Sequence, residues 1–281
     1  MNLIAAGEEL YWAAKYLQKP LSTILQYFLR SFMVVLLKNG TRLTLQRGKR
    51  DLGLLVRILH KGWAVKELSN GDLLFSKDSM QLVQPHFGVI AEDLEQAYLV
   101  TKNLAGKNVL DIGGFLGETT VLFKKIAHCN HLYVCEPLKE NRVYLNKNIR
   151  LNNLQKQCTV FPYGVAAHSG SMIVHSKDNP GNAGFGCEKG TFSVRIKTRS
   201  WNEVLSNAIH NHVYYAKVDC EGGEQYLTLC PAKLIAKIPH WVIEIHSNEI
   251  KEKLLKKFDE SGFICSWMKG MIYRFDMKGV T

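Results

Sequence analysis

After residue 105, apolar residues recur along this chain with two different spacings. Continuous apolar runs, such as residues 108–112, alternate with stretches such as Leu138 to Arg150 and Asn248 to Phe258, in which apolar residues return every three or four positions. Continuous runs are typical of strands buried on both faces, and the longer period is typical of helices that cover them. The alternation predicts an open α/β sheet. The predicted strands are 108–112, 131–136, 158–162, 214–219 and 241–246, with strand-like runs at 172–175 and 192–197 and a closing hairpin over 263–268 and 271–275.

The N-terminal third follows a different pattern. Amphipathic segments at 6–18 and 21–31 predict two helices. Apolar residues on both sides of Lys38-Asn39-Gly40 predict a hairpin with a type I′ turn, and a further helix is expected near residues 52–60, followed by short strands. The chain is therefore expected to divide into an accessory α+β region of residues 1–90 and a domain of residues 91–281 that opens with a helix at 91–104.

The glycine-rich turn after the first strand of the second domain is the most informative local motif. Asp111 ends this strand, and Gly113-Gly114-Phe115-Leu116-Gly117 leads into a helix that opens at Glu118-Thr119. Such a turn lets backbone N–H groups approach a ligand. The dinucleotide fingerprint G-x-G-x-x-G would need glycines at 113, 115 and 118. Because Phe and Glu stand at 115 and 118, the motif argues against NAD and FAD.

A second acidic residue, Glu136, ends the next predicted strand. An acid at this place accepts hydrogen bonds from a ribose diol. Asp111 suits a ligand that carries a cation rather than a diphosphate. S-adenosylmethionine has an ammonium, a sulfonium and a ribose diol, so it fits both acids. The alternative is an ordinary strand-to-helix turn that uses glycine for its backbone freedom, and Glu136 at the right element boundary favours the ligand.

Four motifs follow one another in a specific order: DIGGFLGETT, CEPLKENRVYLNKNIRLNNL, KVDCEGGE and VIEIH. Over residues 105 to 250 this order resembles the FkbM-type family of S-adenosylmethionine-dependent methyltransferases. The resemblance implies a seven-stranded Rossmann-like class I methyltransferase sheet and S-adenosyl-L-methionine as the cofactor. Gly114-Phe115, Cys220 and Gly223 replace the usual Ala-Asn, Val and Ala, and the loss of Asn leaves only a backbone role at 115. The predicted cofactor site comprises Asp111, Gly113, Gly114, Phe115, Gly117, Thr119, Glu136 and Pro137.

Polar residues stand at the carboxyl ends of four predicted parallel strands, where ligands of open α/β sheets bind. The family resemblance implies methyl transfer, and we expect O-methylation of a hydroxyl on a small molecule or a sugar. A hydroxyl acceptor must lose a proton. Glu244 and His246 are two residues apart on a strand, so they share one face. The candidate catalytic residues are Asp219, Glu221, Glu244 and His246.

Structural roles for the same residues stay open. His246 could be a hydrogen-bonded histidine at the edge of the sheet, and Asp219 could be a helix N-cap. Glu221 and Glu224 could be acids in a first helical turn, where the helix dipole favours negative charge. Carboxylate oxygens also suit magnesium, so Asp219, Glu221 and Glu244 offer a metal set. We expect no metal, because nothing else in the sequence points to one.

The composition favours a soluble globular protein, with 46% hydrophobic and 22% charged residues. The net charge of +11 makes an RNA methyltransferase the main alternative. The charge is spread along the chain, and the sequence has no N-P-P-[YF] run and no clustered aromatic–basic stretch, so a nucleic-acid partner is disfavoured. A non-catalytic S-adenosylmethionine-binding module is the third interpretation, and the acids at all four strand ends argue against it.

The cysteines and the N-terminus bear on location. The seven cysteines form no C-x-x-C pair and are expected to be buried free thiols in a reducing cytoplasm. Glu8 and Glu9 interrupt the N-terminus, so no signal peptide is expected. Gln26 and Arg30 break the apolar segment 21–37, so no transmembrane segment is expected either. Peripheral membrane contact is left open for Ile24, Phe28 and Phe32.

Overall fold

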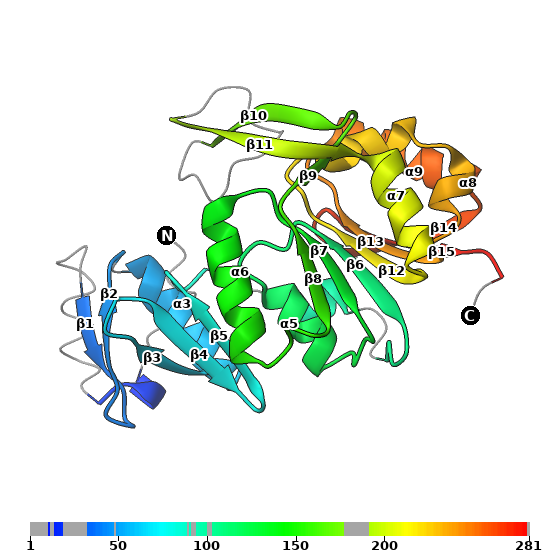
Figure 1. The fold of residues 1–281 in the computed structure, drawn as a ribbon. Helices are drawn as coiled ribbons and strands as arrows, with labels where there is room; N and C mark the ends of the chain where they lie inside the picture. Colours follow the sequence, from blue (N-terminus) through cyan, green and yellow to red (C-terminus); the bar gives the residue numbers. More distant parts are fainter. Residues whose placement is uncertain are drawn as a thin grey trace. The chain divides into compact units, whose positions relative to one another are not determined.

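The computed structural model describes residues 33–47, 49–88, 103–176 and 191–279, together with 11, 14–18, 90 and 94–99. The chain divides into two units, Met1–Asp93 and Leu94–Thr281, whose elements are drawn in Figure 1. The helix predicted at 21–31, including the candidate membrane-contact residues, lies outside the described residues, as does most of the one predicted at 6–18. No helix in the described part of the chain is both long and apolar enough to span a bilayer.

The first unit contains the predicted hairpin, helix and short strands. The hairpin strands are antiparallel and alternate between buried and more exposed positions. A three-stranded antiparallel sheet follows the helix. The elements are β1 (Met33–Leu36), β2 (Arg42–Leu45), α3 (Lys49–His60), β3 (Ala64–Glu67), β4 (Leu73–Lys77) and β5 (Met80–Gln84).

The turn of this hairpin corrects the sequence prediction. The Leu37 N–H donates to the Thr41 carbonyl at 2.8 Å, and the Gly40 N–H donates to the Leu37 carbonyl at 2.9 Å. The loop is therefore three residues long, and within it only Gly40 has a positive φ, of 85°. A type I′ turn needs positive φ at both central residues of a two-residue loop. The prediction of a type I′ turn was wrong. The loop has three residues instead of two, which allows a type I turn followed by a glycine in the left-handed conformation.

The second unit is built on the predicted seven-stranded sheet. Its strand order is β14-β15-β13-β12-β6-β7-β8. All neighbours are parallel except β15, which runs antiparallel to both β13 and β14. The order reverses between β6 and β12, and such a reversal opens a crevice at the carboxyl ends of the strands. The strands are β6 (Asn108–Ile112), β7 (Leu132–Cys135), β8 (Cys158–Phe161), β12 (Val213–Val218), β13 (His240–Glu244), β14 (Phe263–Lys269) and β15 (Ile272–Met277).

Helices cover both faces of this sheet (Figure 1). Two lie on one face, and a hydrophobic core cluster around Trp201, Trp241 and Phe258 forms against the others. A capping box, in which Ser200 and Glu203 bond each other's backbone N–H groups, fixes the start of α7. The helices are α5 (Glu118–Lys125) and α6 (Lys139–Leu151) on the first face, and α7 (Trp201–His210), α8 (Ala232–Ile235), α9 (Asn248–Glu260) and the 3₁₀ helix η3 (Gly223–Leu229) on the other.

Three features differ from the sequence expectation. The strand-like runs form a separate three-stranded sheet of β9 (Gly164–Ala166), β10 (Gly170–Ser176) and β11 (Phe192–Ser200). Of the helix expected at 91–104, the structure describes α4 (Leu94–Tyr98); residues 91–93 and 100–102 lie outside the described residues, and Leu99, Asn103 and Leu104 are not helical. The six described cysteines are free, but Cys265, expected to be buried, is exposed on the edge strand β14.

Candidate functional site

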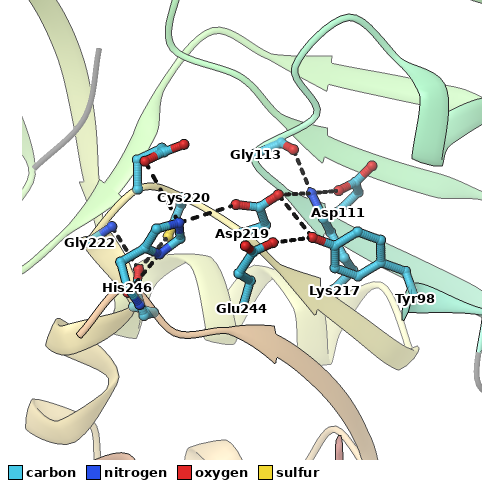
Figure 2. A network of polar contacts seen from close by, with 11 residues as sticks. Tyr98, Asp111, Gly113, Lys217, Asp219, Cys220, Gly222, Glu244 and His246 are labelled. Atoms are coloured by element: carbon cyan, nitrogen blue, oxygen red, sulfur yellow. Dashed lines mark hydrogen bonds and ion pairs between the residues drawn. The ribbon is translucent and has the colours of Figure 1, made fainter. Parts of the chain in front are cut away.

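A buried ionic network lies at the carboxyl ends of β6 and β12, where the strand order reverses (Figure 2). Lys217 Nζ lies 3.2 Å from Asp111 Oδ1 and 3.7 Å from Asp219 Oδ2, and it donates to the Gly113 carbonyl at 2.6 Å. Burial favours the neutral lysine, but the charges of Asp111 and Asp219 outweigh it and hold the pKa of Lys217 well above its usual value. Lys217 is therefore a permanent cation inside the sheet.

Asp111, a predicted cofactor residue, is fully buried within this network. Its Oδ2 accepts hydrogen bonds from the hydroxyls of Thr119 at 2.8 Å and Thr120 at 3.3 Å. We expected a cation of the ligand beside Asp111, and the structure places Lys217 there. Sequence reasoning missed Lys217, although a charged residue inside the apolar run of a central parallel strand was a usable signal.

The three glycines of the turn are required by close packing. A Cβ atom on Gly113 would lie 1.6 Å from the Asp219 carbonyl oxygen, and φ at Gly113 is 87°. A Cβ on Gly114 would lie 2.3 Å from Val134 Cγ1, and one on Gly117 would lie 2.9 Å from a Leu145 methyl. The glycines therefore let the turn pack against the end of β12, against β7 and against α6. The Gly113 and Gly114 N–H groups donate to the Cys135 carbonyl, at 2.9 and 3.1 Å.

Glu136 joins the glycine-rich turn to the end of β7. Its Oε2 accepts from the Phe115 N–H at 2.9 Å, and its Oε1 accepts from the Leu138 N–H at 2.8 Å and from Asn141 Nδ2 at 3.3 Å. Burial raises the pKa of Glu136 to about 7, although these hydrogen bonds oppose the shift. A carboxylate offers about four lone-pair directions, and three donors already use this one, so the group keeps capacity for about one further donor. The structure thus brings Phe115 against Glu136, which precedes Pro137 in the chain; all three are residues of the predicted cofactor site.

His246 lies just beyond β13, against a buried carboxylate. Its ring Nδ1 and its backbone N–H each lie 3.0 Å from Glu224 Oε1, and Glu224 is fully buried in the first turn of η3. The other ring nitrogen, Nε2, lies 3.7 Å from both Asp219 Oδ1 and Glu221 Oε2. Burial lowers the pKa of His246, but the hydrogen bond and charge of Glu224, with the charges of Asp219 and Glu221, raise it to about 9. The N-cap of η3 is Gly222, so Asp219 is not the cap of that helix.

Tyr98, which sequence reasoning also missed, connects two of the candidate catalytic acids. Its hydroxyl lies 2.5 Å from Glu244 Oε2 and 3.1 Å from Asp219 Oδ2. Burial and the charges of both acids hold the pKa of Tyr98 well above its usual value, so the hydroxyl keeps its single proton and donates to one acid at a time.

All four predicted catalytic residues lie near the ends of β12 and β13. The only sequence signal for Tyr98 was its place in the segment that precedes β6.

One family of known proteins matches more than half of this chain. The family description "Methyltransferase FkbM domain" matches residues 105–275, which is more than half of the chain. No curated protein matches the sequence. Among solved structures, the chain is similar to methyltransferase FkbM from Methylobacillus flagellatus KT, with 15% identity and a TM-score of 0.46 over 63% of this chain and 45% of that one. The chain thus spans less than half the length of that protein.

Two further solved structures show the range of similar proteins. M. jannaschii TYW2 in complex with AdoMet has 11% identity and a TM-score of 0.39 over 73% of this chain and 83% of that one. M. capricolum TrmK in complex with S-adenosyl-homocysteine has 12% identity and a TM-score of 0.37 over 66% and 67% of the two chains.

Proposed function

Because this chain belongs to the FkbM methyltransferase family, we propose that it transfers a methyl group from S-adenosyl-L-methionine to a hydroxyl of a small molecule or a sugar. When bound, this cofactor supplies an electrophilic methyl group on a sulfonium. The turn at 113–117 supports this proposal, because its three glycines let it pack closely against the end of β12, β7 and α6 at the point where the strand order reverses. We propose that Glu136 binds the ribose diol. Lys217, which is paired with Asp111, donates a hydrogen bond to the Gly113 carbonyl and so fixes the turn.

The observation that supports the hydroxyl acceptor is the arrangement of His246. Glu224 fixes the ring through Nδ1, so that Nε2 faces the carboxylates of Asp219 and Glu221. Glu244, at the end of the neighbouring strand, accepts a hydrogen bond from the Tyr98 hydroxyl. The carboxylates at this edge of the sheet provide acceptors for the proton that a hydroxyl must lose, and the imidazole that Glu224 orients joins them once the pH exceeds its pKa of about 9. We propose that the proton acceptor is drawn from Asp219, Glu221, Glu244 and His246.

The test of this function uses the protein with isotopically labelled S-adenosylmethionine and fractionated small molecules and glycans. We expect label in a product that mass spectrometry identifies as a methyl ether. A methylated nitrogen in the product would overturn the hydroxyl assignment, and label in added tRNA would favour the RNA-methyltransferase alternative.

Substitution of Glu244 then tests its share in the proton transfer. A positioned base typically contributes about 10²- to 10⁴-fold to the rate, so we expect Glu244→Gln to lower turnover by a factor in this range. Its affinity for S-adenosylmethionine should stay close to that of the parent. Glu249→Gln, at an exposed position on α9, is the matched control and should leave turnover unchanged. Full activity in Glu244→Gln would assign the role to the other candidates.

We further propose that residues 1–90 select the acceptor and that residues 91–281 bind the cofactor, because every nucleoside-binding motif lies after residue 105. A shortened chain that starts at Leu94, the first residue of the second unit, tests this division. It should bind S-adenosylmethionine as the full chain does, and its circular dichroism should show a folded domain. Loss of cofactor binding in a folded shortened chain would contradict the proposal.

A further inference from the structure

We propose that Asp219, Glu221 and His246 form a binding site for a divalent transition-metal cation such as Mn²⁺ or Zn²⁺. One ligand atom from each of these residues lies within 4.8 Å of the other two. The His246 Nε2 is 3.7 Å from an oxygen of each acid, which is too long for a hydrogen bond. Ligand atoms that share a cation at about 2.1 Å lie about 3.4 Å apart in a tetrahedral site, which is close to the 3.7 Å between His246 Nε2 and each acid.

The support behind His246 is a second and separate observation. Its Nδ1 is bonded to Glu224 Oε1 at 3.0 Å, and the other Glu224 oxygen accepts from the Gly222 N–H at 2.9 Å. Histidines that bind metals almost always pair their second ring nitrogen with a carboxylate, carbonyl or water, which fixes the orientation of the ring. Here the carboxylate is fully buried, and the ring that it orients points Nε2 at Asp219 (Figure 2).

The donor set decides the class of cation. The sequence had offered Asp219, Glu221 and Glu244 as an all-oxygen set for magnesium. In the structure Glu244 Oε2 accepts a hydrogen bond from the Tyr98 hydroxyl at 2.5 Å. His246 replaces Glu244 as the third member of the set. An imidazole nitrogen with two carboxylates favours Mn²⁺, Fe²⁺, Co²⁺ or Zn²⁺ over magnesium, which prefers oxygen ligands. Three protein ligands also leave at least one coordination position for an oxygen of the acceptor.

The role of this cation rests on the proposed function. A hydroxyl that binds a divalent cation loses its proton more readily than a free hydroxyl. The proton passes to Glu244, which lies outside the ligand set and is held by Tyr98. The acceptor oxygen then forms its bond to the methyl carbon, while the carbon–sulfur bond breaks and its electron pair stays on sulfur as a thioether. The step needs no oxidant or reductant.

Mn²⁺ binding to the full-length protein tests the site without any methyl acceptor. The protein is first treated with EDTA, and free Mn²⁺ is then followed by electron paramagnetic resonance during titration. We expect one bound ion per chain, with an affinity lowered about tenfold or more in Glu221→Gln. The Glu221 side chain is 58% exposed, so this variant should keep its fold, which circular dichroism checks. Glu249→Gln, with a 79% exposed side chain, is the control and should bind Mn²⁺ as the parent does.

Two results would overturn the proposal: no saturable Mn²⁺ binding at millimolar concentration, or equal affinity in the parent and Glu221→Gln. Affinity for S-adenosylmethionine is measured on the same metal-free samples, which separates this inference from the proposed function. Cofactor binding without metal binding would refute the cation site alone. Co²⁺ provides an independent readout, since its visible absorption reports nitrogen and oxygen ligands and should be lost in His246→Ala.

Discussion

Substitution of Lys217 by Met tests the buried ionic network on which the geometry of the site depends. The lysine side chain is 2% exposed, and its partner Asp111 is 0% exposed. Methionine has a similar length and no charge, so it fills much of the same space. The Asp111 carboxylate would then keep its burial and the hydroxyls of Thr119 and Thr120, but it would lose its cation.

The expected cost follows from this burial. Removal of one partner of a buried ion pair destabilises a protein by about 3 to 5 kcal/mol, because it leaves an uncompensated buried charge. Lys217→Met also removes the hydrogen bond to the Gly113 carbonyl, which adds about 1 kcal/mol. A domain is stable by about 5 to 15 kcal/mol in total, so the substitution should remove a large fraction of the free energy of unfolding.

The assay is urea denaturation followed by circular dichroism. The double variant Asp111→Asn with Lys217→Met removes both charges and keeps an oxygen that accepts from Thr119, so it should recover about 2 kcal/mol or more over Lys217→Met alone. Lys253→Met, which removes an exposed pair with Glu249, is the control and should change stability by less than about 1 kcal/mol. If the double variant lost as much free energy of unfolding as Asp111→Asn and Lys217→Met lose when added together, the Lys217 charge would not be compensating the Asp111 charge.

Two further predictions concern buried groups near the turn. Burial raises the pKa of Glu118 from 4.5 to about 8, so the folded state binds this proton more tightly than the unfolded state. Stability should therefore fall by about 4 to 5 kcal/mol as pH rises from about 4.5 to 8. Glu118→Gln should flatten this decline when stability is measured by urea titration at several pH values. An unchanged slope of stability against pH would contradict the assignment of the decline to Glu118. Gly113→Ala places a Cβ 1.6 Å from the Asp219 carbonyl, so it should cost more than about 3 kcal/mol. Gly106→Ala, with a similar φ of 74° and no atom within 4 Å, should cost only about 1 to 2 kcal/mol, and equal costs would refute the packing argument.

The central strands and the glycine-rich turn could be predicted because their signals are local. The run at 108–112 became β6 with the same bounds, since an apolar run that ends at a glycine needs no distant partner to define it. The seven-stranded sheet followed from the order of the family motifs. The glycine-rich turn follows β6 as expected, but the close packing of Gly113 involves the Asp219 carbonyl, which only the folded chain brings beside it.

The contacts that set the chemistry of the site could not be predicted, because they join distant segments. Tyr98 and Glu244 are 146 positions apart, and nothing in either segment indicates the other. The pairing of Asp111 with Lys217 depends on the register of β6 against β12, in which these two residues are direct partners. Sequence spacing placed the acids at one edge of the sheet, but it could not show which of them already had a partner.

Calorimetric titration with S-adenosylmethionine tests the central claim most directly. The account predicts one molecule bound per chain and no tight binding of NADH. It also predicts that, at a pH well above the Glu136 pKa of about 7, Glu136→Ala weakens binding by about 2 to 3 kcal/mol, or about 30- to 160-fold, through lost hydrogen bonds to a charged acceptor. Glu140→Ala, at an exposed position in the first turn of α6, should bind as the parent does. Unchanged affinity in Glu136→Ala, or tight NADH binding in place of S-adenosylmethionine, would contradict the account.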